Sequence, residues 1–369
     1  MRYVSGWVLT EEGFKEGSIG FEDGIVREVT NQKVNDPIAR GIIMPTFLNP
    51  HTHIGDSFIS EEIRGSLEDV VGPPNGLKHR RLREAGRKEI VDAMRLTAKR
   101  MFKSGITAFC DFREGGLDGI SMLFESCLGL DVKPIVLGRP VHMRYDREEM
   151  TSLLRVLDGI GVSSVSDWDY SQLEKISQAA RSKGLHFALH ASEGRREDID
   201  SILDLKPSFL VHMTRATDSD LERCADSDVP VVVCPRSNAF FGELPDIPRM
   251  LSKKVTLMLG TDNAMISSPS IWDEMRFAYY VGKFRGDLSV LDVVRMTMNS
   301  RKGLKGELAL GSTVGKKSNF MVLAPQSHSP QMKHILSASD RDVSLICIGE
   351  KVWKRTGLVE IGQDEGGNG

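Results

Sequence analysis

The 369-residue sequence lacks the features that mark several large classes of protein. It contains only 5 cysteines, none in a CxxC spacing, which argues against a disulfide framework or a cysteine zinc knot. No apolar run approaches the roughly 20 residues that cross a bilayer, and the first residues lack the apolar core of a signal peptide. The net charge of −3 gives no reason to expect nucleic acid or an anionic membrane as a partner. We therefore expect a reduced, cytoplasmic protein.

Both ends of the chain carry short β-strand patterns that are too small to enclose a core separately. Near the N-terminus, Asp23-Gly24 separates two alternating apolar runs, which is the signal of a tight hairpin. Near the C-terminus, further apolar runs around a glycine turn are again typical of strands. We therefore predict a small β-sandwich domain built from residues 1–42 and 308–369, with a larger domain of residues 43–307 inserted between them.

The central part alternates short apolar segments with longer amphipathic ones. The first apolar segment ends at His51-Thr52-His53, and seven more follow at residues 106–111, 133–137, 161–165, 185–190, 209–212, 229–234 and 255–261. Eight such β-then-α units over roughly 260 residues have the size of a (β/α)8 TIM barrel. The competing architecture, a doubly wound open sheet, usually carries a GxGxxG or phosphate-loop signature on its first strand, and we find neither. The predicted fold class is therefore α/β, a (β/α)8 barrel with a small β domain.

Four histidines and one aspartate fall at the carboxyl ends of predicted barrel strands. His51 and His53 end the first strand, His190 the fifth and His212 the sixth, and Asp262 follows the eighth. In a barrel these ends converge on one mouth, and alternate residues such as His51 and His53 share a side of their strand. Any one such histidine is more often structural, but the set favours a zinc or ferrous-iron centre with an open position for water. A metal would lower the pKa of that water, and Asp262 could accept its proton.

Glu193 lies three residues beyond His190, just past the end of the predicted fifth strand. A carboxylate there can reach both the attacking water and a substrate atom. Partial burial would raise its pKa into the range where it can receive and return a proton. The alternative is a surface glutamate that caps the helix expected from about residue 195. We favour the catalytic role.

A long polar segment at residues 55–86 separates the first strand from the next helical pattern. A loop of this length in a compact domain is usually functional, often as a lid. Its basic run at residues 78–83 is equally compatible with a solvated surface and with substrate contact. The candidate substrate contacts are Asp56 and Phe58 in this segment, and Arg139 and His142 after the third strand. For Arg139, an ion pair that stabilises a loop is an equally good explanation.

Five segments together resemble the amidohydrolase superfamily, in particular its cytosine deaminase and chlorohydrolase-like branch. In chain order they are PTFLNPHTHIGDSF, LHASEG, FLVHMT, VCPRSNAFFG and LGTDNAMISSPSIWDEM. They span the predicted barrel in the family's order, and the flanking β segments are similar to the family's two-ended β-sandwich domain. The resemblance therefore covers nearly the whole chain and implies the same fold.

The resemblance also implies a role for each matching residue. The implied ligands of one divalent metal, Zn²⁺ or Fe²⁺, are His51, His53, His190 and Asp262. Glu193 matches the family's proton-shuttling glutamate, and His212 matches the histidine that hydrogen-bonds the attacking water or the developing oxyanion. The two-metal branches use a carboxylated lysine on strand 4, and residues 161–165 contain no lysine, which favours a single metal. Residues 234–238 look like the family's strand 7 loop, which shapes the pocket without a ligand role.

The residues and the resemblance together predict hydrolytic deamination of an amino-substituted nitrogen heterocycle of the pyrimidine, purine, nucleoside or pterin type. A metal-bound hydroxide would attack the carbon beside a ring nitrogen that Glu193 protonates, and ammonia would leave. Cyclic-amide hydrolysis, as in imidazolonepropionase-like members, and dechlorination are alternatives within the same chemistry. A non-catalytic metal-binding barrel is the alternative outside it. We expect a small heterocyclic molecule as the partner, and a homodimer or larger homo-oligomer as the assembly.

Overall fold

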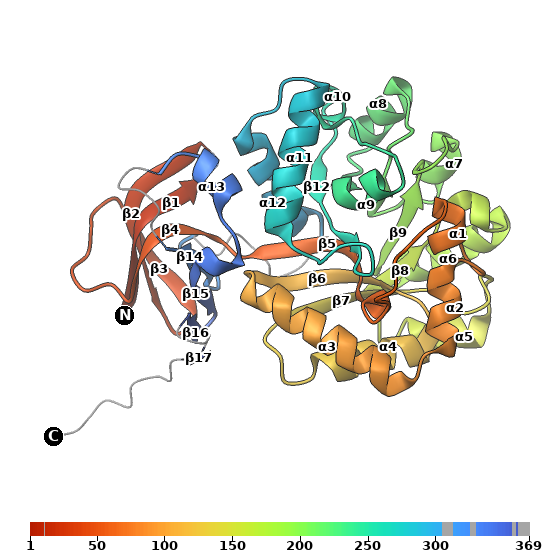
Figure 1. Ribbon diagram of the computed structural model, residues 1–369, viewed down its shortest axis with the longest axis horizontal. Helices are drawn as coiled ribbons and strands as arrows, with labels where there is room; N and C mark the ends of the chain where they lie inside the picture. The colour runs from red at the N-terminus through yellow and green to blue at the C-terminus, as the bar shows by residue number, and fades with distance from the viewer. Residues whose placement is uncertain (11, 305–312, 325–329, 356–358, 361–369) are drawn as a thin grey trace.

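The computed structural model describes residues 1–10, 12–304, 313–324, 330–355 and 359–360. Figure 1 shows two parts, a sheet that joins strands from both ends of the chain and a larger part in which helices surround a curled sheet. The predicted boundary between residues 307 and 308 lies outside the described residues, and the proposed domain limits stay a prediction. In the part of the chain that the structure describes, no helix is long and apolar enough to cross a membrane.

The sheet built from the chain ends has eight strands in the order β17-β16-β15-β14-β4-β1-β2-β3. Their bounds are β1 Arg2–Thr10, β2 Gly13–Glu22, β3 Ile25–Thr30, β4 Ala39–Pro45, β14 Asn319–Leu323, β15 Val343–Ile348, β16 Lys351–Lys354 and β17 Val359–Glu360. The predicted hairpin is present: β2 and β3 are joined by Asp23 and Gly24, whose φ values of 50° and 72° suit a two-residue turn. The antiparallel pairing of β14 with β4 connects the two chain ends.

This sheet curls over its own apolar core. Phe21 on β2 and Phe320 on β14 are separated by two strands in the sheet, yet their rings pack edge to face with centroids 5.3 Å apart. Val4, Ile43 and Leu345 are buried in the same cluster. The joining of both chain ends in one β unit agrees with the sequence analysis. The strands form one continuous sheet, and their division into a two-sheet sandwich stays a prediction.

The larger part is built on a parallel sheet in the order β12-β11-β10-β9-β8-β7-β6-β5-β13. The bounds are β5 Phe47–His53, β6 Ile106–Arg113, β7 Lys133–Gly138, β8 Gly159–Val162, β9 His186–Ala191, β10 Phe209–His212, β11 Val231–Val233, β12 Leu257–Leu259 and β13 Asp262–Asn263. In the short segment between β12 and β13, Gly260 N donates to Val233 O of β11 (3.0 Å) and Thr261 N donates to His51 O of β5 (3.2 Å). The α/β class and the curled parallel sheet were both predicted.

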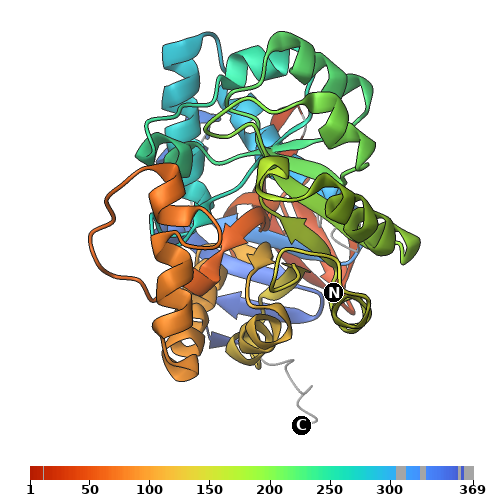
Figure 2. The ribbon, with the colours of Figure 1, turned by 90° about the vertical axis from the view of Figure 1, so that its right-hand side faces the viewer.

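Helices lie on the outside of the curled sheet (Figure 2). They are α3 Arg87–Lys103, α4 Gly116–Cys127, α5 Arg147–Leu153, α6 Tyr170–Ser182, α7 Ile199–Asp204, α8 Asp218–Asp226, α9 Pro235–Phe240, α10 Ile247–Ser252, α11 Ile271–Arg285 and α12 Val290–Gly303. Helix α3 buries Ile90, Met94, Ala98 and Met101, which recur at helical spacing on one face. The smaller elements α13 Lys333–Ser337 and η3 Asp340–Asp342 lie between β14 and β15.

The fourth strand of the parallel sheet is displaced from its predicted position. It was expected at residues 161–165, but β8 spans Gly159–Val162. Val165 instead begins the short helix η2 (Val165–Asp167), and Ser163 accepts a hydrogen bond from Trp168 Nε1 at 3.0 Å. The chain leaves the sheet early because the Ser163 side chain makes a local hydrogen bond that competes with strand pairing.

The long polar segment, residues 55–86, is partly helical, and we call it the cover segment. It follows η1 (Ile54–Asp56) and contains α1 (Leu67–Val71) and α2 (Leu77–Glu84). A capping box between Ser66 and Asp69 begins α1. Helix α2 buries Lys78 and His79 and exposes Arg80 and Arg83. The basic run is therefore divided between the interior and the surface.

Candidate metal centre and active site

Three histidines and one aspartate meet at the carboxyl-terminal ends of β5, β9 and β13. Strand β13 pairs in parallel with β5, so that Asp262 lies opposite Thr52, between His51 and His53. One ligand atom from each of these three and from His190 lies within 4.8 Å of all the others. Asp262 Oδ1 is 3.2 Å from His51 Nε2 and 3.6 Å from His53 Nε2. The structure thus places all four predicted ligands in one cluster.

The hydrogen bonds of two histidines show which nitrogen faces this cluster. His53 Nδ1 lies 3.0 Å from the carbonyl oxygen of Phe112, and His190 Nδ1 lies 2.9 Å from that of Val162. A carbonyl only accepts, so each Nδ1 donates its proton and each Nε2 presents a lone pair. Burial lowers the pKa of both imidazoles, so both stay neutral.

These two lone pairs are the best test of whether the cluster fits a metal ion. His53 Nε2 and His190 Nε2 are 3.4 Å apart. Neither nitrogen carries a proton, so no hydrogen bond can join them. Two facing lone pairs repel, and a shared cation is the simplest group that would bring them together. Three imidazoles and a carboxylate are a donor set that suits zinc or ferrous iron. The residues present therefore fit one divalent cation.

Asp262 is held as an anion at the centre of the cluster. Its Oδ2 accepts a hydrogen bond from Ser237 Oγ at 2.5 Å. Burial alone would raise the pKa of Asp262, but the hydrogen bond with His51 and the surrounding imidazoles keep that pKa well below its usual value. The backbone of Asp262 is left-handed, with φ of 61°, and so is that of His212, with φ of 77°. Such φ values are uncommon outside glycine and often occur at functional sites.

Glu193 and His212 form a second group that shares Asp262 with the first. One ligand atom from each of the three lies within 4.8 Å of the others, and His212 Nε2 is 3.3 Å from Glu193 Oε2. Burial raises the pKa of Glu193 well above its usual value, and the charge of Asp262 raises it further. Burial also lowers the pKa of His212 to about 3. A glutamate whose pKa is raised and a histidine whose pKa is lowered therefore stand beside the ligand cluster.

The capping alternative for Glu193 does not match the local structure. The next helix, α7, starts at Ile199, and Asp198 caps it by accepting a hydrogen bond from Ser201 N. The side chain of Glu193 is 12% exposed and faces His212.

Two residues that the sequence analysis assigned only to the pocket wall contact Asp262, Glu193 and His212 directly. Ser237 and Asn238 lie in α9, which follows β11, and both are fully buried. Ser237 contacts Asp262, whereas Asn238 Nδ2 is 3.2 Å from Glu193 Oε1 and 3.1 Å from His212 Nδ1. The signals for them in the sequence were their position just after a strand end and their place in the segment that resembles the family's strand 7 loop.

A network of buried charges surrounds His53. Glu114 Oε1 lies 3.1 Å from His53 Nδ1 and 2.7 Å from Lys78 Nζ, and Glu114 Oε2 lies 2.6 Å from Arg113. Lys78 also donates to Asn263 Oδ1 at 3.3 Å. Burial would raise the pKa of Glu114, but Lys78, His53 and Arg113 together hold it well below its usual value. The network joins α2 of the cover segment to the end of β6 and to β13.

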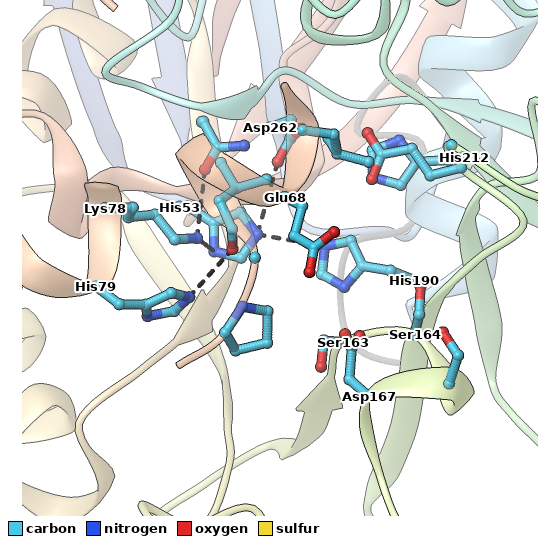
Figure 3. Close-up of a pocket in the computed structure, with 18 of the residues that line it drawn as sticks. His53, Glu68, Lys78, His79, Ser163, Ser164, Asp167, His190, His212 and Asp262 are labelled. Carbon is cyan, nitrogen blue, oxygen red and sulfur yellow. Dashed lines mark hydrogen bonds and ion pairs between the residues drawn. The ribbon is translucent and has the colours of Figure 1, made fainter. Parts of the chain in front are cut away.

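A cavity of about 430 Å³ opens above the two groups, within the range of about 300–1,000 Å³ typical of small-molecule sites. Figure 3 shows Lys78 and His79 of the cover segment on one side of it. Ser163, Ser164 and Asp167, which follow β8, lie on another side. The cover segment therefore forms part of the cavity wall, and its chemistry contributes to what the cavity can bind.

Only one of the four predicted substrate contacts lines this cavity. Arg139 lines it, and no ion pair of its side chain is present among the described residues. His142 is exposed and lies outside the lining. Asp56 is fully buried and accepts a hydrogen bond from Met265 N at 2.9 Å, and Phe58 packs against the main core. His142, Asp56 and Phe58 are not among the residues that line the cavity, and a role for them in substrate contact stays a prediction.

Comparisons with known proteins agree with this geometry. Residues 42–348 match the Amidohydrolase family. An uncharacterised protein of Methanocaldococcus jannaschii is 34% identical over 357 residues, which are 89% of this chain and 92% of that protein. A 5-methylthioadenosine/S-adenosylhomocysteine deaminase of Halobacterium salinarum is 24% identical over 279 residues, 66% of this chain and 63% of that enzyme. The crystal structure of an atrazine chlorohydrolase of Arthrobacter aurescens with zinc has a TM-score of 0.81 at 16% identity, covering 98% of this chain and 97% of the other.

Proposed function

Because this chain belongs to the amidohydrolase family, we propose that it is a metal-dependent enzyme that hydrolytically deaminates an amino-substituted nitrogen heterocycle. The observation that carries the proposal is the position of Glu193. Its buried carboxyl group, with a raised pKa, stands beside His212 and Asp262 and next to a four-ligand cluster. A carboxylic acid that keeps its proton near neutral pH is what protonation of a ring nitrogen requires. The deaminase among its relatives supports the same chemistry.

The ligands of the metal would be His51, His53, His190 and Asp262. A divalent cation bound there would lower the pKa of a water molecule and so supply a nucleophile at neutral pH. Both Zn²⁺ and Fe²⁺ suit this donor set, and the zinc in the structurally similar chlorohydrolase favours Zn²⁺. The absence of lysine from β8 supports a single ion.

The chain's own residues would divide the remaining tasks. Glu193 delivers a proton to the ring nitrogen and later passes one to the departing amine. Asp262 accepts a proton from the attacking water, because it is the ionised carboxylate of the group. His212 hydrogen-bonds the oxygen on which negative charge develops. The cavity admits a small heterocycle, and Lys78, Arg139 and the serines after β8 offer it polar contacts.

We also infer that the curled sheet is a closed (β/α)8 barrel. The hydrogen bonds of Gly260 to β11 and of Thr261 to β5 support this, as does the likeness to the chlorohydrolase fold. A cytoplasmic location and a homodimer or larger assembly remain predictions from the sequence.

An assay of ammonia release over a panel of aminopyrimidines, purines, nucleosides and pterins tests the function. We expect ammonia from at least one class of substrate. Glu193→Gln should retain the metal and lose kcat by about 1,000-fold, whereas Glu222→Gln, a change of an exposed partner of Lys253, should leave kcat unchanged. An active Glu193→Gln enzyme would refute the shuttle role. Ring opening or chloride release without ammonia would favour the amide or chlorohydrolase alternatives, and bound metal without any turnover would favour a non-catalytic barrel.

A further inference from the structure

Asn238 contacts both groups that are proposed to handle protons. Its side-chain nitrogen Nδ2 lies 3.2 Å from Glu193 Oε1 and 3.1 Å from His212 Nδ1. The other edge of the imidazole, His212 Nε2, lies 3.3 Å from Glu193 Oε2. The amide is thus connected to Nδ1 of His212 and to one oxygen of Glu193.

The position of Asn238 is fixed by its surroundings. Its backbone nitrogen donates to Cys234 O, and its backbone carbonyl accepts from the nitrogens of Phe241 and Glu243, all at 2.9–3.1 Å. The preceding Arg236 is bound by the buried carboxylate of Glu274, with Nε–Oε2 at 2.5 Å. Asn238 itself is 0% exposed. A residue held this firmly imposes its hydrogen-bonding pattern on its neighbours rather than adapting to theirs.

The chemistry of the amide determines what it does to His212. A side-chain NH₂ has two hydrogens, and the two neighbours of Asn238 Nδ2 can accept one each. The structure places Nδ2, and not Oδ1, toward both neighbours, whereas a reversed amide would turn its acceptor oxygen to the same two atoms. With Nδ2 in this place, His212 Nδ1 accepts a hydrogen bond, so the single proton of the neutral imidazole resides on Nε2.

We propose that Asn238 is a positioning residue that holds His212 with its proton on Nε2, which makes His212 a hydrogen-bond donor to the reacting oxygen and not a base. The inference rests on the proposed function only in naming the reacting oxygen as the atom to which His212 donates. It leaves the acceptance of the water's proton to Asp262, because His212 Nε2 already carries a proton. It also orients Glu193, since Oε1 is occupied by the amide and Oε2 is left for proton exchange.

Two substitutions separate this role from a merely structural one. Asn238→Asp keeps the shape but replaces the donor with an acceptor, so His212 would donate from Nδ1 and present a bare Nε2. Asn238→Leu removes both hydrogen bonds and leaves the tautomer of His212 free. We expect kcat to fall by about 100-fold or more in Asn238→Asp, the effect of losing a donor to a developing oxyanion, and by about 10-fold in Asn238→Leu. A structural role predicts the opposite order, because leucine alters the polarity of the site more than aspartate does.

The control substitution is Asn299→Asp. Asn299 is another partly buried amide, and its Nδ2 donates to the backbone carbonyl of Leu257 at 3.0 Å. The same change of donor to acceptor there should leave kcat within about twofold, because the residue lies on α12 away from the cavity.

The tautomer itself can be measured without turnover. In the zinc-loaded protein labelled with ¹⁵N-histidine, His212 is assigned by the signals that His212→Gln lacks. We expect its Nε2 to carry the proton in the wild type and its Nδ1 to carry it in Asn238→Asp. A wild-type His212 protonated on Nδ1, or a larger loss of kcat in Asn238→Leu than in Asn238→Asp, would overturn the inference. If no substrate is turned over, the spectrum still decides the role of Asn238, so failure of the proposed function is distinguishable from failure of this inference.

Discussion

The ammonium group of Lys78 lies 2.7 Å from Glu114 Oε1, and both side chains are buried, at 4% and 10% exposure. This ion pair joins α2 of the cover segment to the residue that follows β6. Glu114 in turn contacts His53 Nδ1 at 3.1 Å. The wall of the cavity and the orientation of a proposed metal ligand are therefore parts of one charged network.

Breaking this ion pair should destabilise the protein. Lys78→Met leaves Glu114 buried with Arg113 as its remaining strong partner. We expect the free energy of unfolding to fall by about 3 kcal/mol, at the low end for a broken buried pair because Arg113 remains. Denaturant unfolding at a fixed concentration of free zinc measures the change.

Two further variants show whether the loss of stability comes from the unpaired buried charge of Glu114. The double variant Lys78→Met/Glu114→Gln should recover part of the loss, because no uncompensated charge is left in the interior. Lys88→Met breaks the exposed pair with Asp92 and should change stability by less than about 0.5 kcal/mol. Equal stabilities of Lys78→Met and the wild type would contradict a buried, functional pair.

Removal of the metal should abolish activity and lower stability together. At a free zinc concentration of 100 times the Kd, a bound ion contributes about 2.7 kcal/mol, and a chelator would remove this contribution. His190→Asn should lose stoichiometric metal binding, because His190 supplies one of the four clustered ligand atoms. Metal content by atomic emission and thermal unfolding with and without chelator provide the test. His334→Asn, which changes a histidine of α13, should bind metal as the wild type does.

Glu114 should affect metal affinity through His53. Loss of an outer partner of a metal-ligating histidine typically weakens metal binding 10- to 100-fold, and we expect Glu114→Gln to fall in this range. Competition with a chromophoric chelator measures the Kd. Glu68→Gln is the matched control, because Glu68 lines the same cavity but is not part of the ligand cluster. An unchanged Kd in Glu114→Gln would show that the carbonyl of Phe112 suffices to orient His53.

His79 should make the protein less stable in mild acid. Burial lowers its pKa from 6.5 to about 3, and the charge of Lys78 lowers it further. The folded pKa lies below the unfolded one, so this contribution to stability is complete above pH 6.5 and is lost as the pH falls toward 3. Between pH 7 and pH 5 the wild type should lose about 2 kcal/mol more than His79→Asn. Denaturant unfolding of both proteins at pH 7 and pH 5 measures this difference in the free energy of unfolding. His142→Asn, which removes an exposed histidine, should parallel the wild type, and parallel curves for His79→Asn would refute the prediction.

The positions of His51, His53, His190 and Asp262 were predictable because they depend on local and topological rules. Strand periodicity puts the first two on one side, and parallel strands bring distant carboxyl ends to one edge of the sheet. The joining of both chain ends in one β unit was predictable for a similar reason, since neither end can bury its apolar face alone.

The buried charges were not predictable in the same way. The basic run at residues 78–83 has no property that separates Lys78 from Arg80 until α2 is packed against the end of β6. Burial then places the lysine beside Glu114 and leaves the arginine in solvent. His142, which was predicted to contact substrate, is exposed, because its segment turns outward after β7.

By itself, the sequence determined the α/β class, the pairing of the two chain ends and the chemical types at the strand ends, because hydrophobic spacing and chain order are written along the chain. Only the tertiary structure decided the partner of each nitrogen and oxygen. Asn238 and Glu193 are 45 residues apart, and Lys78 and Asn263 are 185 apart. Contacts of hydrogen-bond length between such distant residues depend on how whole elements pack, and these contacts determine the surroundings of His212 and Glu193.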